Sequence, residues 1–331
     1  MDNPGSVSLG TIIDGRFRLL NCLGQGGFGE VWKAADLRLE PRNVAIKFLH
    51  TSALADDMAV QRFETEAKAL SILNSPNIVS IVDRGIHENR YFIVMELLEG
   101  STLGGWLDDY RSQNEWPDLK QALSLFDQVA QAVEIAHSIE DPGPILHRDL
   151  KPSNVFLSKT RHSGSITVKV VDFGLAQLGR REITPSGAMM GTLPYMAPEQ
   201  AFGIQSAISP ASDVFALGVL LIELVTLQSV SPSQGPWWAH VAQNGDLDPS
   251  ILGNMRPDLP EFIWSILCKA LARRPDDRFR NAGEMRSALQ AVHAEVSVLR
   301  FGTLKRGVTG PLWEFLSLIL LEWEELCPME V

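Results

Sequence analysis

The sequence predicts an α+β fold in which a strand-rich first third precedes a mostly helical remainder. Short runs of β-branched and aromatic residues fill the first hundred positions, and a long stretch with helical periodicity covers residues 119–138. Between them, Glu99-Gly100-Ser101 has the composition of a hinge. With 331 residues, of which 45% are hydrophobic, the chain can bury a large core in about two lobes.

These observations give a division of the chain into consecutive parts. We expect a flexible N-terminus over residues 1–15, and then one main folded domain over 16–298. Its N-terminal lobe covers residues 16–98 and its C-terminal lobe 99–298. Residues 299–331 are expected to form a linker and an amphipathic helix.

Composition disfavours several classes of protein. The net charge is -11 and the isoelectric point about 5.1, whereas a general nucleic-acid binder needs a basic surface. Three widely separated cysteines (Cys22, Cys268, Cys327) suggest a reducing, cytoplasmic setting. The first residues lack the basic and apolar regions of a signal peptide. No uncharged apolar run approaches the ~20 residues of a membrane helix, so we expect no span.

A strand pattern begins at Ile12 and continues through residues 16–20 and 22–23, and a glycine-rich stretch follows over 24–31 (GQGGFGEV). Glycines let the backbone turn sharply and bring N–H groups close to phosphate oxygens. A dinucleotide-binding turn would require a helix directly afterwards. Here residues 31–34 resume a strand pattern, so a hairpin is expected; a purely structural hairpin is the alternative.

A lysine lies within the next strand, residues 44–49 (VAIKFL). Because burying an unpaired charge is costly, Lys47 is expected to pair with an acid, unless it is a solvated edge residue. Glu66, in a helical segment over residues 58–73, is the preferred partner, and Glu64 is the rival.

The segments after this helix complete the first lobe and begin the second. Residues 78–83 and 91–97 have strand patterns joined by a polar turn at 87–90. The helix over residues 119–138 ends before a breaker, Asp141-Pro142-Gly143-Pro144.

The stretch after the breaker, residues 147–154 (HRDLKPSN), combines an acid, a cation and an amide that suit phosphoryl transfer. Asp149 can accept a hydroxyl proton, and Lys151 can steady the migrating phosphoryl group. Asn154 and the later Asp172, in Asp-Phe-Gly, offer hard oxygens to Mg2+. Strand patterns over residues 154–157 and 168–171 would hold the two segments side by side. A polar loop whose acid pairs with its own arginine is the alternative.

With these segments in order, the sequence resembles a eukaryotic-type (Hanks-type) Ser/Thr protein kinase of the kind found in bacteria. The resemblance covers roughly residues 17–296, and several independent matches at the right separations carry it. The matching positions are 24–31, 44–47, Glu66, 147–154, 172–174, 197–199, Asp213 and Arg278.

The resemblance implies a bilobal protein kinase fold, with a five-stranded antiparallel N-lobe that carries one main helix, and a mostly helical C-lobe. It implies catalytic roles for six residues: Asp149, Lys151, Asn154, Lys47, Glu66 and Asp172. Mg2+, or Mn2+ as an alternative ion, would be held by Asn154 and Asp172. ATP would contact Leu23, Gly24, Gln25, Gly26, Gly27, Phe28, Gly29, Val31, Ala45, Lys47, Met95, Glu96, Leu98 and Phe156.

Other positions receive structural or docking roles from the resemblance. Thr192 would help to dock the protein substrate, and Glu199 would pair with Arg278. A regulatory stack anchored by Asp213 would contain Leu70, Ile81, His147 and Phe173. The remaining histidines are interpreted as surface or ordinary core residues.

The implied activity is ATP-dependent phosphorylation of Ser and Thr hydroxyls of protein substrates, increased by autophosphorylation at Thr184 or Ser186. Two alternatives are a nucleotide-binding pseudokinase scaffold and a small-molecule kinase. Pseudokinases usually lack an equivalent of Lys47, Asp149 or Asp172, and small-molecule kinases lack the peptide-docking segment seen at residues 191–199.

The tail also carries a pattern. Residues 302–311 contain three glycines and a proline, which is typical of a linker, and residues 312–326 place most apolar side chains on one helical face. Its acidic polar face disfavours an anionic membrane surface. We expect this helix to dock on the same chain or on a second copy; a disordered end is the alternative.

Overall fold

A computed structural model describes residues 7–26, 29–39, 42–49, 72–88, 90–141, 143–159, 166–173, 193–228, 256 and 259–301. The chain divides into two compact units, Met1–Leu289 and Gln290–Val331. The first unit holds the elements that build the candidate site. The predicted docking helix of the tail lies outside the described residues.

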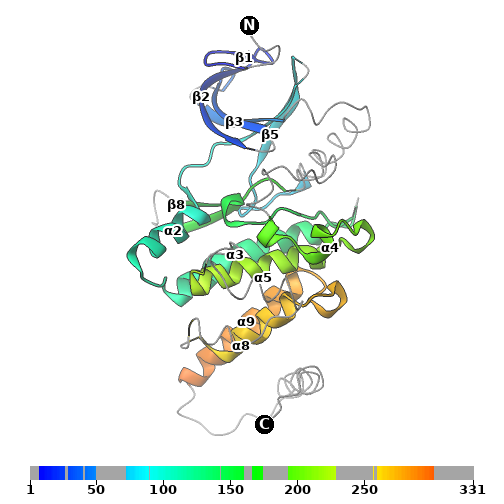
Figure 1. Cartoon of the computed structure of the whole chain (residues 1–331). Coiled ribbons are helices and arrows are strands. Elements are labelled where there is room, and N and C mark those ends of the chain that lie inside the picture. The colour runs from blue at the N-terminus through cyan, green and yellow to red at the C-terminus, as the bar shows by residue number, and fades with distance from the viewer. Residues whose placement is uncertain are drawn as a thin grey trace. The chain divides into compact units, whose positions relative to one another are not determined.

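The first lobe is built on an antiparallel sheet of six strands that curls on itself (Figure 1). This confirms the predicted α+β kinase-like N-lobe, with one short strand more than the five expected. In spatial order the strands are β1 (Ile12–Ile13), β2 (Phe17–Gly26), β3 (Gly29–Asp36), β4 (Arg42–Leu49), β6 (Arg90–Glu96) and β5 (Ile81–His87).

The start of the ordered lobe differs from the prediction of a flexible segment over residues 1–15. Strand β1 pairs Ile12 with Arg18 and Ile13 with Phe17, and the side chain of Ile13 is completely buried. The sheet therefore begins before residue 16, because an isoleucine packed into the core fixes this part of the chain.

The fourth predicted strand, residues 78–83, is shifted in the structure. Strand β5 begins at Ile81, and residues 77–79 bond to Val170 of the second lobe instead. Val79 N–H donates to Val170 O at 3.0 Å, and Val170 N–H donates to Asn77 O at 2.8 Å. The apolar pattern was read correctly, but its first residues pair with a strand that lies far away in the sequence.

The two faces of the curled sheet carry different side chains. Cross-strand partners point to the same face, and successive residues alternate between faces. The observed pairs are Val31 with Lys47 and Ala45 with Met95, so these four share the face directed toward the predicted nucleotide. The opposite face carries a buried core: Ile13, Phe17, Leu19, Trp32, Ala34, Val44, Ile46, Phe48, Phe92 and Val94.

The second lobe combines a small sheet with helices. Three strands, β7 (Ser101–Thr102), β8 (Val155–Lys159) and β9 (Ile166–Val170), form the sheet. The described α-helices of this lobe are α2 (Leu103–Gln113), α3 (Leu119–His137), α4 (Pro198–Ala201), α5 (Pro210–Thr226), α8 (Glu261–Ala270) and α9 (Ala282–Phe301). Four 3-10 turns occur in the described part, at Pro152–Asn154, Leu193–Tyr195, Gln205–Ala207 and Pro275–Asp277.

Helix α5 forms the centre of this lobe. Its residues from Ala211 to Thr226 are all buried, as expected of a helix that is mostly apolar around its circumference, and they include the acids Asp213 and Glu223. Helices α3 and α8 pack against it (Figure 1). The predicted helix at 119–138 is confirmed as α3, which begins after Asp118, whose carboxylate caps it by accepting from Gln121 N–H.

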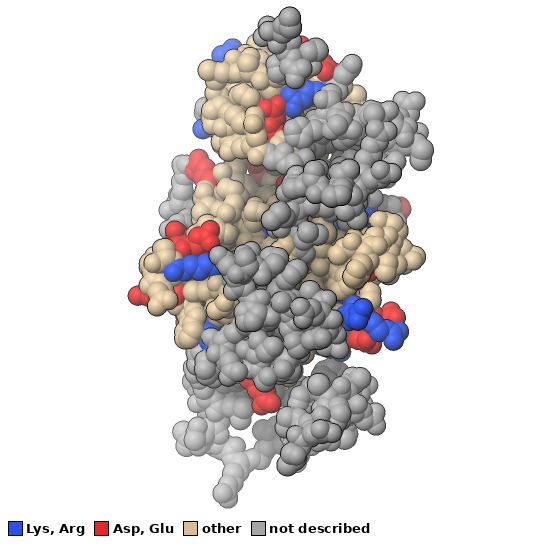
Figure 2. Space-filling view, viewed as in Figure 1, with Lys and Arg blue, Asp and Glu red and all other residues tan. Residues whose placement is uncertain are grey.

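The described surface is mixed in charge. On the face shown in Figure 2, acidic and basic side chains of the described residues lie in small mixed groups and not in one continuous basic field. Among the described helices, none has the length and apolar character needed to cross a membrane.

Candidate active site

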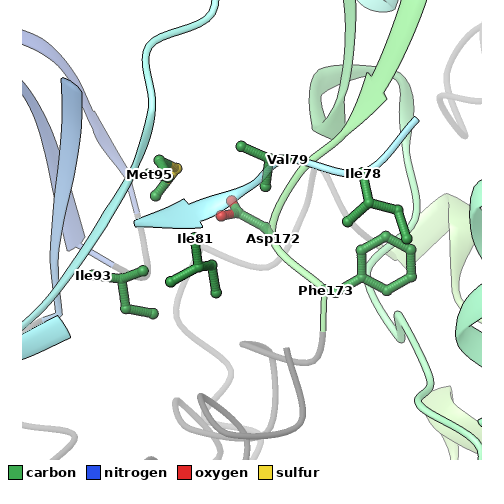
Figure 3. Close-up of a pocket in the computed structure, with 7 residues that line it drawn as sticks. All are labelled: Ile78, Val79, Ile81, Ile93, Met95, Asp172 and Phe173. Carbon is green, nitrogen blue, oxygen red and sulfur yellow. The ribbon is translucent and has the colours of Figure 1, made fainter. Parts of the chain in front are cut away.

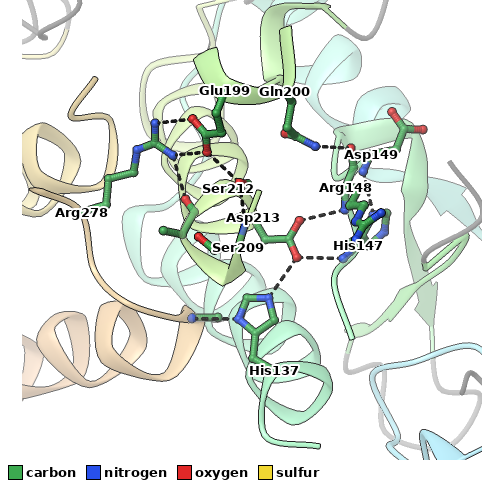
Figure 4. Close-up of polar contacts among 12 residues, drawn as sticks. His137, His147, Arg148, Asp149, Glu199, Gln200, Ser209, Ser212, Asp213 and Arg278 are labelled. Carbon is green, nitrogen blue, oxygen red and sulfur yellow. Dashed lines mark hydrogen bonds and ion pairs between the residues drawn. The ribbon is translucent and has the colours of Figure 1, made fainter. Parts of the chain in front are cut away.

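Residues 147–154, which we call the catalytic loop, are held by one buried carboxylate on α5. Asp213 accepts hydrogen bonds from the backbone N–H of His147 at 2.7 Å and of Arg148 at 2.8 Å (Figure 4). It also pairs with His137 Nε2 on α3 at 2.9 Å, and Ala282 N–H donates to His137 Nδ1. Burial alone would raise the pKa of Asp213, but the bonds from His137 and the backbone outweigh it and lower that pKa. An ionised carboxylate therefore holds two consecutive N–H groups of the loop.

The backbone of this loop adopts an uncommon conformation. Arg148 has φ = 63°, in the left-handed region that costs a non-glycine residue about 1–3 kcal/mol. Its N–H is held by Asp213, and its carbonyl accepts from Gln200 Nε2 on α4 at 3.1 Å. The loop is thus bonded on both sides of the strained residue, which keeps the next residue, Asp149, in a single orientation.

The side chain of Asp149 lies between a cation and an amide. Its carboxylate is 2.9 Å from Lys151 Nζ, and Asn154 Nδ2 donates to Asp149 Oδ2 at 3.1 Å and to its carbonyl at 2.8 Å. Because these bonds use the amide nitrogen of Asn154, its amide oxygen is the atom suited to a cation. The structure brings these three predicted catalytic residues together.

The other predicted acid meets the predicted phosphate-binding lysine. Lys47 Nζ on β4 is 2.7 Å from Asp172 Oδ2, and only 5% of Lys47 is exposed. Asp172 also has a positive φ, 63°. Among the described residues Lys47 pairs with Asp172, and the predicted partners Glu66 and Glu64 lie outside them, so the pairing of Lys47 with either glutamate stays a prediction.

A small, mostly apolar pocket adjoins this ion pair. Figure 3 shows the carboxylate of Asp172 among side chains from the first lobe. Met95, a predicted ATP contact, contributes to the lining from the end of β6. The lining residues are Ile78, Val79, Ile81, Ile93, Met95, Asp172 and Phe173.

His147 is a buried packing residue. Its ring lies 4.6 Å from the ring of Phe173, between centroids, and it is completely buried. Burial lowers its pKa, and the neutral ring accepts Asp149 N–H at Nδ1 while Nε2 faces Val171 O at 3.0 Å. This agrees with the expected stack, of which Leu70 lies outside the described residues.

Several predicted ATP contacts lie on strands that pair in register with one another. Ala45 pairs with Met95, and 6% of its surface is exposed. Leu23 is half exposed at the end of β2, where Gly24 pairs with Val31. The other predicted ATP contacts that the structure describes lie mostly on the first lobe: Gln25 and Gly26 on β2, Gly29 on β3, Glu96 on β6 and Leu98 just after β6. Phe156, on β8, lies on the second lobe.

The side chain of Glu96 faces a cation that sequence reasoning did not identify. Lys169 Nζ on β9 is 2.7 Å from Glu96 Oε1 and also donates to Ile78 O at 3.3 Å. The same carboxylate accepts from Ser80 N–H at 2.8 Å. This pair connects the end of the first sheet to the strand that leads to Asp172.

The pair Glu199–Arg278 forms a buried, bidentate ion pair. The two bonds measure 2.8 and 2.9 Å, and Ser212 Oγ donates to Glu199 at 2.6 Å (Figure 4). Burial would raise the pKa of Glu199, but the bonds from Arg278 and Ser212 lower it. The guanidinium lies 5.0 Å above the ring of Phe215, so α4 is joined firmly to α5.

Several predicted residues lie outside the described part of the chain. They are Glu66 of the expected ion pair, Gly27 and Phe28 of the glycine-rich stretch, the phosphorylation candidates Thr184 and Ser186, and the predicted docking residue Thr192. Their roles stay predictions.

Two residues that hold the catalytic loop were missed by sequence reasoning. His137 was interpreted as a surface or ordinary core residue, yet it supports Asp213, and Gln200 bonds the carbonyl of Arg148. His137 ends an apolar helix, which is a weak signal for burial. Nothing in the sequence indicates a partner 76 residues away.

Comparisons with known proteins agree with this geometry. The family model described as protein kinase domain matches residues 17–291. The chain is 35% identical over 280 residues to a probable serine/threonine-protein kinase, PknB, of Lactococcus lactis, covering 84% of this chain and 42% of that protein. It is 35% identical over 284 residues to the serine/threonine-protein kinase PrkC of Bacillus subtilis, covering 85% and 41%.

A third relative and a solved structure give the same result. The serine/threonine-protein kinase PknA of Mycobacterium tuberculosis is 34% identical over 295 residues, covering 87% of this chain and 64% of that protein. The crystal structure of the Mycobacterium tuberculosis PknI kinase domain superposes with a TM-score of 0.64 at 27% identity, covering 86% and 99%. The chain thus spans about two fifths of the length of the first two relatives.

Proposed function

Because the chain belongs to the protein kinase domain family, we propose that it is an active Ser/Thr protein kinase that uses Mg-ATP. The observation that carries the proposal is the position of Asp149, buried between Lys151 and Asn154 on a loop with a fixed backbone. A carboxylate held in this way can orient an acceptor hydroxyl and take its proton. The names of the relatives support Ser and Thr as acceptors.

Each charged side chain has a role in this proposal. Lys47 would hold the phosphates of ATP, and Lys151 would balance the charge on the transferred phosphoryl group. The carboxylate of Asp172 and the amide oxygen of Asn154 are hard oxygen donors, which fit Mg2+. Bound Mg2+ would neutralise charge on the phosphates of the donor. The pair Lys47–Asp172 keeps both charges compensated inside the protein.

The proposal is tested by phosphoryl transfer from radiolabelled ATP to a generic protein substrate. Wild type should transfer label to serine and threonine, and Lys47→Met and Asp149→Asn should transfer far less label in the same time. A pseudokinase scaffold would bind a fluorescent ATP analogue yet transfer no label in Mg2+ or Mn2+. This result would overturn the proposal and favour that alternative.

We also propose that phosphorylation of Thr184 or Ser186 activates the enzyme. A phosphate adds nearly two negative charges, which can order a segment against an arginine next to the catalytic residue, here Arg148. Mass spectrometry of autophosphorylated protein should find phosphate at one of these positions. The double variant Thr184→Ala, Ser186→Ala should be slow, and full activity in it would contradict the idea.

A further inference from the structure

The base of the glycine-rich hairpin is held by a buried cation from a different strand. Arg90 begins β6 and is 6% exposed. Its Nη1 lies 2.6 Å from Oε1 of Glu30 on β3, and its guanidinium lies 4.9 Å above the ring of Phe48 on β4. The side chains of Arg90 and Glu30 are 8% and 13% exposed. One arginine therefore connects three strands.

The acid of this pair sits where the hairpin returns to the sheet. Glu30 directly follows Gly29, the last glycine of the glycine-rich stretch. Gly29 pairs with Gly26, and Glu30 pairs with Gln25. A contact that fixes Glu30 therefore fixes one end of a segment whose glycines give it much conformational freedom.

The pair acts from the face of the sheet that a nucleotide would not touch. Glu30 pairs across strands with Phe48, and Phe48 pairs with Phe92, two residues after Arg90, so these side chains share the core face. The neighbour of Glu30, Val31, points to the opposite face, as does its partner Lys47. Neither Arg90 nor Glu30 can contact ATP in the cleft directly.

We propose that Arg90, through Glu30, is a positioning residue that holds the glycine-rich hairpin ready for the phosphates of ATP. This inference rests on the proposed function. A charge-assisted hydrogen bond in a desolvated site restrains the strand end more strongly than a solvated pair would. Restraining the hairpin before binding reduces the conformational entropy lost when phosphates bind.

The other end of β3 offers a matched control. Asp36, the last residue of the strand, lies on the same core face as Glu30, is completely buried and pairs with Arg16 at 2.7 Å. Arg16 also pairs with Asp83 and lies 4.6 Å above the ring of Phe17. The chemistry, strand and face are the same, but Asp36 pairs with Phe17, far from the glycines in the strand register.

The experiment compares the two arginines in the full chain. Arg90→Met and Arg90→Lys are measured beside Arg16→Met and Arg16→Lys, together with Glu30→Gln and the double variant Arg90→Met, Glu30→Gln. The readouts are KM for ATP, kcat, Tm, and the Kd of a fluorescent ATP analogue. The analogue is bound without turnover, so its Kd is informative even if the chain transfers no phosphate.

We expect Arg90→Met to raise the KM for ATP and the Kd of the analogue about tenfold, with kcat within about twofold of wild type. Arg90→Lys keeps the charge but loses the planar fork, so it should restore part of the affinity. Adding Glu30→Gln to Arg90→Met should give no further loss, because both changes remove one interaction. Arg16→Met should lower Tm and leave the Kd of the analogue near that of wild type.

Two results would overturn the inference. One is an analogue Kd that rises equally in Arg16→Met and Arg90→Met in proportion to the fall in Tm, which would make both pairs merely structural. The other is a wild-type Kd in Arg90→Lys and Glu30→Gln. These two milder variants also carry the test if Arg90→Met does not fold.

Discussion

The catalytic loop and the glycine-rich hairpin are held in place by different kinds of contact. The loop is held through its backbone, by Asp213 on α5 and Gln200 on α4. The hairpin is held through a side chain, by the pair of Arg90 with Glu30. Backbone bonds fix one conformation, strained φ included, whereas a side-chain ion pair restrains only the strand end. The loop fixed through its backbone carries the acid, and the strand end restrained by a side chain borders the glycines proposed to meet the phosphates.

The largest effect, a loss of kcat, should come from Asp149→Asn in the catalytic loop. Since a positioned base contributes about 10²–10⁴-fold, kcat should fall by this factor while the Kd of a fluorescent ATP analogue stays near wild type. Single-turnover transfer and analogue titration measure the two quantities. Transfer within threefold of wild type would contradict the comparison, because the fixed loop would then position nothing essential.

Helix α4, which carries Gln200, is anchored by the buried pair of Glu199 with Arg278, and we expect this pair to contribute to the stability of the protein. Arg278→Met leaves the carboxylate of Glu199 buried without its cation, and we expect a loss of about 3–5 kcal/mol in the free energy of unfolding. Denaturant unfolding measures this, with Arg280→Met, whose partner Glu284 lies at the surface, as the matched control. Similar losses of unfolding free energy in both variants would mean that the buried pair contributes no more stability than the surface pair.

On the nucleotide side, Lys47→Met should lower kcat/KM by about ten- to a hundredfold, because hydrogen bonds to charged groups are worth about 1.5–3 kcal/mol. Glu66→Ala should lower it less, since Lys47 also pairs with Asp172. Steady-state kinetics in ATP decide this. A damaging Glu64→Ala beside a silent Glu66→Ala would show that the helix register was read wrongly.

Low pH should reduce the stability that the pair of Glu199 with Arg278 contributes. Glu199 has a lowered pKa in the folded protein, so it contributes stability above its ordinary pKa of 4.5 that is lost as pH falls through the folded value. Unfolding measured from pH 7 to pH 3 should show the difference between wild type and Glu199→Gln shrinking below about pH 4.5. A difference independent of pH would contradict the assigned pKa direction.

The smallest effect should come from the pair that connects the two sheets. Lys169 and Glu96 are partly exposed, so Lys169→Met should cost only about 0.2–1 kcal/mol of stability. A double-mutant cycle with Glu96→Gln isolates the coupling energy between Lys169 and Glu96. A coupling well above this range would place this pair with the rigid anchors instead.

Local sequence determined the identity of the chemical groups. The spacing within residues 147–154 and 172–174 was enough to name Asp149, Lys151, Asn154 and Asp172, and the structure brings Asp149 together with Lys151 and Asn154. Apolar periodicity also gave α3 almost to the residue. These signals are local, because a turn or a helical face is specified by neighbours within a few positions.

Only the tertiary structure decided what holds those groups. His137 and Asp213 are 76 residues apart, and Gln200 reaches a carbonyl 52 residues away. Strand β5 begins later than predicted because residues 77–79 bond to β9. Arg90 and Glu30 lie on the strands that flank β4, and their side chains meet across it. No periodicity links such partners. Their proximity follows from the packing of the whole sheet on the helices, which a single sequence does not specify.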